Sequence, residues 1–164
     1  MEDPVILGVS LGTRRVGIAI GTKDILLERQ VKGFDERFSE KKMQRICRSI
    51  EKLIALYGIS GIAVKAPRAI SRSKAINQTM AALSMLALSQ RIPIVIYDLE
   101  ALEGRFISTV AKNKTKLACA MVQSYPELMR FYSKIESGKK TYYIKMFEAV
   151  AAMRLFSESL GNLP

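Results

Sequence analysis

The alternation of short apolar runs with helical patterns most constrains the fold of this chain. The segments 5–10 (VILGVS), 61–67 (GIAVKAP) and 92–98 (IPIVIYD) are almost continuously apolar. Such runs are typical of strands that are buried on both faces of a sheet. Two helical patterns, over 39–58 and 71–90, separate the three runs. This order predicts right-handed crossovers and a parallel sheet core.

Two further strand patterns follow the first apolar run. Segment 15–21 (RVGIAIG) alternates larger and smaller apolar residues, and 25–34 (ILLERQVKGF) is a more polar strand. Short turns join these segments, so we predict an antiparallel meander on one edge of the sheet. The predicted fold is therefore α/β, with a mixed five-stranded sheet flanked by helices. We expect residues 1–164 to form a single domain.

Helix-end signals are clearest around the first helical pattern. Ser39 is a predicted N-cap, apolar residues recur at i, i+3, i+4 and i+7, and Gly58 is the predicted stop. For the second helix, Ser71 is the predicted cap. Beyond residue 98 the sequence is helical in pattern, with a break at Pro126 and a last helix over 142–161.

Charge and residue content exclude several function classes. The chain has 26 Lys and Arg against 15 Asp and Glu, a net charge of +11, which favours polyanionic partners such as nucleic acid. It has no histidine, which excludes a histidine-bearing zinc site, a Ser-His-Asp triad and a Cys-His dyad. Cys47 and Cys119 have no metal-binding spacing. Without a signal-peptide pattern or a membrane-length apolar run, we expect a cytoplasmic protein with no membrane partner.

Three segments, in this order, carry a resemblance to a known family. Segment 6–20 (ILGVSLGTRRVGIAI) is an apolar strand, a Gly-Thr turn and a Gly-containing strand. Segment 110–122 (VAKNKTKLACAMV) is a basic loop and helix, and 142–153 (YYIKMFEAVAAM) is an Ala-rich helix. Together they resemble the RNase H-like superfamily, and within it the RuvC-type Holliday junction resolvases and their YqgF-type relatives. The resemblance implies the RNase H-like fold, a nucleic-acid partner and a homodimer that straddles a four-way junction.

The resemblance also implies where catalytic acids would lie. Family members use carboxylates at the ends of the first and fourth strands and on the last helix to hold two metal ions that hydrolyse a phosphodiester. The matching positions here are Ser10, Lys65, Lys145 and Glu148, so one carboxylate remains of four. No residue of this set is assigned a catalytic role.

Electrostatics disfavours metal binding at these positions. Two unit charges ~4 Å apart interact by roughly 4 kcal/mol at an effective dielectric of 20. Two ammonium groups therefore repel a divalent cation, and we expect Lys65 and Lys145 to pair with Glu148 instead. No cofactor is expected. Mg²⁺ or Mn²⁺ is implied only if Glu148 acts in a rearranged site with other acids, for which the candidates are Asp24, Asp98, Glu100 and Glu103.

Two basic sets are candidates for binding nucleic-acid phosphates. The turn after the first strand offers backbone N–H groups and two guanidinium forks, from Gly12, Thr13, Arg14 and Arg15. The second set follows the carboxyl ends of predicted strands, where open α/β sheets bind ligands, and comprises Arg68, Arg72, Lys74, Lys112, Lys114 and Lys116. The alternative for Arg14 and Arg15 is that they are solvated turn residues that bind no phosphate. Tyr142 and Tyr143 could stack on bases, although aromatic residues near a helix start more often serve in packing.

Three functions follow from these observations. The first is a degenerate RuvC-like protein that binds branched or double-stranded nucleic acid, with DNA favoured, through phosphate contacts without cutting it. The second is an active metal-dependent endonuclease of the Holliday junction resolvase type with a rearranged acidic site. The third is a protein-interaction module that has kept the fold and lost nucleic acid.

Overall fold

A mixed five-stranded sheet forms the centre of the molecule. The computed structural model describes residues 3–34, 37–108 and 114–161. The strands lie in the order β3-β2-β1-β4-β5. Their bounds are β1 Ile6–Leu11, β2 Arg15–Gly21, β3 Leu26–Gly33, β4 Gly61–Lys65 and β5 Ile94–Tyr97. Antiparallel pairing joins β1, β2 and β3, whereas β1–β4 and β4–β5 are parallel. The predicted meander and parallel core are confirmed.

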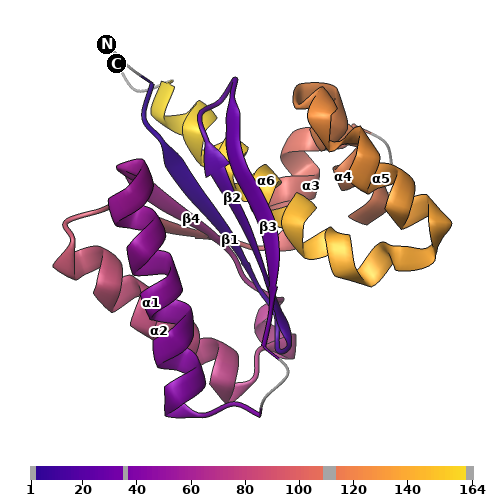
Figure 1. The fold of residues 1–164 in the computed structure, drawn as a ribbon. Coiled ribbons are helices and arrows are strands. Elements are labelled where there is room, and N and C mark those ends of the chain that lie inside the picture. The colour runs from indigo at the N-terminus through magenta and orange to yellow at the C-terminus, as the bar shows by residue number, and fades with distance from the viewer. Residues whose placement is uncertain (1–2, 35–36, 109–113, 162–164) are drawn as a thin grey trace.

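Helices cover both faces of this sheet. In Figure 1, α1 and α2 lie on one side of the strands, and α3 to α6 lie on the other. The bounds are α1 Glu40–Tyr57, α2 Lys74–Ser89, α3 Leu99–Phe106, α4 Lys114–Ser124, α5 Met129–Lys134 and α6 Lys140–Gly161. Single turns span Ala69–Ser71, Pro126–Leu128 and Ile135–Lys139. No helix among the described residues is long and apolar enough to cross a lipid bilayer.

The ends of α1 follow from local side-chain chemistry. The Ser39 side chain accepts a hydrogen bond from the Lys42 backbone N–H, and Gly58 has the left-handed backbone (φ +62°) that ends the helix. The predicted N-cap of α2 is wrong by two residues. A 3₁₀ turn occupies Ala69–Ser71, and Ser73 rather than Ser71 caps α2 by accepting from the Ile76 N–H.

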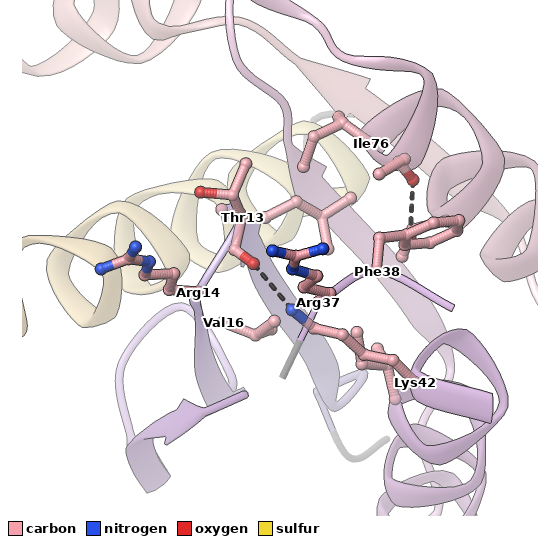
Figure 2. Close-up of a pocket in the computed structure, with 12 residues that line it drawn as sticks. Thr13, Arg14, Val16, Arg37, Phe38, Lys42 and Ile76 are labelled. Carbon is pink, nitrogen blue, oxygen red and sulfur yellow. Dashed lines mark hydrogen bonds between the residues drawn. The ribbon is translucent and has the colours of Figure 1, made fainter. Parts of the chain in front are cut away.

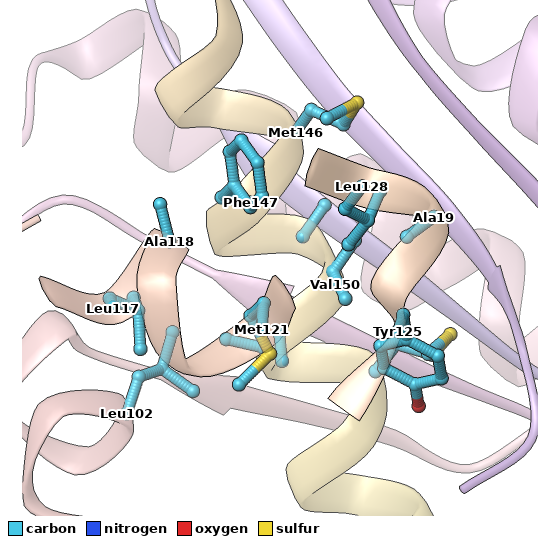
Figure 3. Packing of buried hydrophobic residues seen from close by; sticks show 14 of the residues in the cluster. Ala19, Leu102, Leu117, Ala118, Met121, Tyr125, Leu128, Met146, Phe147 and Val150 are labelled. Carbon is cyan, nitrogen blue, oxygen red and sulfur yellow. The ribbon is translucent and has the colours of Figure 1, made fainter. Parts of the chain in front are cut away.

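Two apolar cores lie on the two faces of the sheet. Because side chains alternate along a strand, Leu7 and Val9 of β1 pack against α1 and α2, whereas Ile6 packs against the opposite layer. Figure 3 shows that opposite layer, where Phe147 and Val150 of α6 lie among side chains of α3 and α4 and the strand residue Ala19.

The last helix approaches the strands unusually closely. A Cβ atom at Gly8 or Gly17 would overlap the backbone carbonyl of Ala149 or Lys145, so glycine at these two strand positions allows α6 to lie directly on β1 and β2. Residues 149–153 of α6 are all buried. This contact fixes Glu148 over the face of the sheet that Ser10 shares with Gly8.

Candidate functional site

The candidate site forms where two parallel strands end beneath α6. Ser10 on β1 pairs in register with Lys65, the last residue of β4. Both side chains are buried, and Glu148 of α6 is buried with them. Lys145 lies one helical turn before Glu148 and is partly exposed. The structure therefore brings together all four positions that match the family's acids.

Glu148 is held by three neighbouring side chains. Its Oε2 atom lies 2.8 Å from Lys65 Nζ. Its Oε1 atom accepts a 3.2 Å hydrogen bond from Ser10 Oγ and lies 3.5 Å from Lys145 Nζ. Lys145 Nζ also donates to the Leu11 carbonyl at 3.3 Å, which ties the helix to the end of β1. The predicted ion pairs of Glu148 with both lysines are confirmed.

Burial makes the Lys65–Glu148 pair strongly coupled. The side chain of Lys65 is 4% exposed and that of Glu148 is 1% exposed, so water has almost no access to solvate either charge if its partner is removed. Breaking such a pair leaves an uncompensated charge in a medium that solvates it poorly. With two ammonium groups and one carboxylate, the cluster carries a formal net charge of +1.

These donors do not fit a pair of magnesium ions. Mg²⁺ is bound through oxygen ligands, usually carboxylates, and a two-metal centre requires several of them. The site supplies one carboxylate, from Glu148, and one neutral hydroxyl, from Ser10. Lys65 Nζ already lies against Oε2 of that carboxylate. No cluster of three or more Asp, Glu or Cys suited to metal binding occurs in the described part of the chain. Asp98, one of the alternative acids, caps α3 by accepting from the Ala101 N–H at 2.8 Å.

The Gly12–Arg15 turn directly adjoins the site. A Cβ at Gly12 would lie 2.9 Å from Cε of Lys145, so the turn and the ion-pair cluster are in contact. Arg14 and Arg15 are exposed. Figure 2 shows the Arg14 guanidinium directed away from the neighbouring cavity, and that of Arg37 directed toward Thr13.

Sequence reasoning missed Lys42, which anchors this turn. Its Nζ atom donates to the Thr13 carbonyl at 2.8 Å (Figure 2). It also donates to the Phe34 carbonyl at 2.9 Å. Lys42 is buried four residues before Ile46 on the apolar stripe of α1. This spacing was the sequence signal that Lys42 is buried and bonded, because a lysine on a buried stripe needs polar partners. Lys42 borders a cavity of about 250 Å³ between the turn, α1 and α2.

The second basic set is divided between the two helical layers. Arg68 is exposed in the segment between β4 and α2, and Lys74 is exposed as the first residue of α2. Arg72 donates its Nε–H to the Pro67 carbonyl at 2.8 Å. Lys116 is half-buried on α4, which packs on α6 in the opposite layer. Lys112 lies outside the described residues, and Lys114 is described only as the first residue of α4. Of the described members of this set, Arg68, Arg72 and Lys74 follow the end of β4 beside the candidate site.

Comparison with known proteins defines the class of fold. No family model matches the chain, and no curated protein matches it. Among solved structures, the chain is similar to Thermus thermophilus RuvC, with a TM-score of 0.71, 13% identity and 96% of each chain covered. It is also similar to T. thermophilus RuvC in complex with a Holliday junction substrate, with a TM-score of 0.70, 14% identity and 96% of each chain covered. The chain therefore has the RNase H-like fold, in the arrangement found in RuvC.

Proposed function

We propose that this protein binds branched or double-stranded nucleic acid, DNA in the first place, through backbone phosphates and does not hydrolyse it. The observation that carries the proposal is the 2.8 Å contact between Lys65 Nζ and Glu148 Oε2. A basic side chain engages the remaining carboxylate at a position where the RuvC-type pattern has metal-binding acids.

Loss of hydrolysis follows from the energetics of this contact. A divalent cation at Glu148 would have to displace the Lys65 ammonium, which has almost no access to water. Leaving one member of a buried pair without its partner costs about 3–5 kcal/mol. The neutral Ser10 hydroxyl supplies no charge to offset that cost. The site therefore lacks the means to activate a water molecule through paired metal ions.

Retained binding is supported by charge and by fold. The net charge of +11 favours a polyanion. Arg14, Arg68 and Lys74 are exposed near the ends of β1 and β4, and such side chains contribute sequence-independent phosphate contacts. RuvC, whose structure this chain matches over 96% of its length, has been solved with a Holliday junction substrate. A homodimer is part of the proposal, because junction resolvases of this kind act as dimers.

The binding test uses a labelled four-way junction and a blunt duplex at two salt concentrations. We expect affinity to fall steeply with salt, and the double variant Arg14→Gln/Lys74→Gln to lower the slope of log K against log salt by roughly 2. The double variant Arg48→Gln/Lys52→Gln is the matched control, because both residues are exposed on α1 away from the strand ends. Equal effects of the two variants, or binding that is insensitive to salt, would overturn the proposal.

The cleavage test uses the same junction with EDTA, Mg²⁺ or Mn²⁺. Intact DNA in all lanes, with binding present in EDTA, is the expected result. Metal-dependent cutting that disappears in Glu148→Ala would establish the active-nuclease alternative. An absence of any binding would instead favour the protein-interaction module.

A further inference from the structure

A second surface combines aromatic rings with cations beside the turn. We define the cation–aromatic cluster as Arg15, Arg29, Arg130, Phe131, Lys134, Tyr142 and Tyr143. The Phe131 and Tyr143 rings are 5.4 Å apart between centroids, and Tyr142 meets Tyr143 edge-on at 4.9 Å. Because β3, the start of β2, α5 and the start of α6 all contribute, the cluster exists only in the folded protein.

Four cations lie against these rings. Arg15 lies 5.2 Å from the centroid of Tyr142. Around Phe131, the distances to the centroid are 4.7 Å for Arg130, 5.7 Å for Arg29 and 5.7 Å for Lys134. Cation–π contact of this kind orients a guanidinium over a ring while its N–H groups can still donate to an anion.

Within the described ranges, no carboxylate lies within ion-pair distance of Arg15, Arg29, Arg130 or Lys134. Glu136, two residues beyond the end of α5, lies against Tyr132, where burial, then Cys119 and then Glu136 raise the pKa of the phenol. Concentrated positive charge without local neutralisation is the electrostatic pattern of a polyanion site.

Tyr142 differs from the other two rings in its packing. Phe131 and Tyr143 are half-buried and pack against the core of the α3–α6 layer. Tyr142 is 41% exposed and does not belong to that core. Its contacts are with Arg15 and Tyr143, so a packing role does not account for its position. An exposed aromatic ring held in place by a cation is suited to stacking on a nucleobase.

We propose that the cation–aromatic cluster binds unpaired nucleotides, with a base stacked on Tyr142 and the adjoining phosphates bound by Arg130 and Lys134. The inference rests on the proposed function and extends it from duplex phosphates to single-stranded segments. Arg15 belongs both to the turn and to the cluster, so a strand bound at the turn can continue onto these rings. Ring stacking favours unpaired bases, since bases within a duplex already stack on each other.

The test compares three labelled probes: a single-stranded oligonucleotide, a blunt duplex and a fork with unpaired arms. We expect Tyr142→Ala to weaken single-strand and fork binding about five- to tenfold and to leave blunt-duplex binding unchanged. Tyr142→Phe retains the ring and should retain affinity. Leu56→Ala is the control, because it removes an exposed apolar side chain from α1 in the opposite layer. Equal losses on all three probes, or none on any, would overturn the inference.

A spectroscopic test reports stacking directly. The chain has no tryptophan, so Tyr142→Trp introduces a single reporter whose emission a stacked base quenches. Saturable quenching by the single strand and not by the blunt duplex is expected. Duplex binding without such quenching, and with single-strand affinity independent of Tyr142, would refute this inference and leave the proposed function standing. Tyr142-dependent single-strand binding without duplex or junction binding would refute the proposed function alone.

Discussion

Glu148→Gln tests whether ion pairs hold the candidate site closed to metal ions, as proposed. The substitution preserves shape and removes the carboxylate that pairs with Lys65 at 2.8 Å, where the Lys65 side chain is 4% exposed. Removing one member of a buried pair costs about 3–5 kcal/mol. For a chain of this size, 1 kcal/mol shifts the melting temperature by about 2–4 °C, so we expect a fall of about 6–20 °C.

A double variant separates the charge effect from a loss of packing. Lys65→Met/Glu148→Leu replaces both charges with apolar groups of similar volume, and such replacements are often neutral or stabilising. We expect the double variant to recover most of the stability that Glu148→Gln loses. A double-mutant cycle from urea unfolding, with Lys65→Met and Glu148→Leu as its single variants, measures the coupling between the two positions.

Glu158→Gln is the matched control for this experiment. Glu158 lies on the same helix and pairs with Arg105 at 2.7 Å and with Arg154 at 3.0 Å, and these two arginines are 53% and 23% exposed. Water and salt screen both pairs, so their loss should cost only about 1 kcal/mol. If Glu148→Gln costs no more than Glu158→Gln, the Lys65–Glu148 pair does not close the site, and the argument against metal binding fails.

Three further predictions concern the site and its support. The triple variant Ser10→Asp/Lys65→Glu/Lys145→Asp supplies four carboxylates, and isothermal titration should detect Mn²⁺ binding by the variant and none by the native protein; no binding by the variant would show that the family positions were assigned wrongly. Lys42→Met leaves the Thr13 and Phe34 carbonyls without their donor, and urea unfolding should show a loss of about 1–3 kcal/mol. Gly17→Ala places a methyl group against the α6 backbone, and a loss of at least about 1–3 kcal/mol is expected; an unchanged melting temperature would contradict the close helix–strand contact.

Local chemistry explains which elements were predictable from sequence. The ends of α1 depend on hydrogen bonds within a few residues, from Ser39 at one end and Gly58 at the other, so the sequence pattern is sufficient. The start of α2 was misplaced because Ser71 and Ser73 have equal capping chemistry. The 3₁₀ turn over Ala69–Ser71 decides between them, and no residue pattern signals that turn.

The functional residues also divide into those that a local sequence motif can place and those that only tertiary packing brings together. Ser10, Lys65, Lys145 and Glu148 could be placed because a motif fixes each one relative to its own strand or helix. The cation–aromatic cluster could not, because Arg29 of β3 meets Phe131 of α5 across about a hundred residues of chain. Such a contact depends on how α5 lies along the edge of the sheet, which is a property of tertiary packing and has no local sequence period.

The geometry is compatible with the proposed binding of nucleic acid without cleavage. Glycines at positions 8 and 17 fix α6 on the strands, and strand register fixes Ser10 beside Lys65, whatever the charge of the side chains. Exchanging acids for lysines therefore changes the chemistry at the strand ends without moving the Gly12–Arg15 turn. Each exchange also adds positive charge next to the surface proposed to hold phosphates. Under the proposed function, the side chains that disfavour metal ions therefore also favour retention of the nucleic-acid backbone.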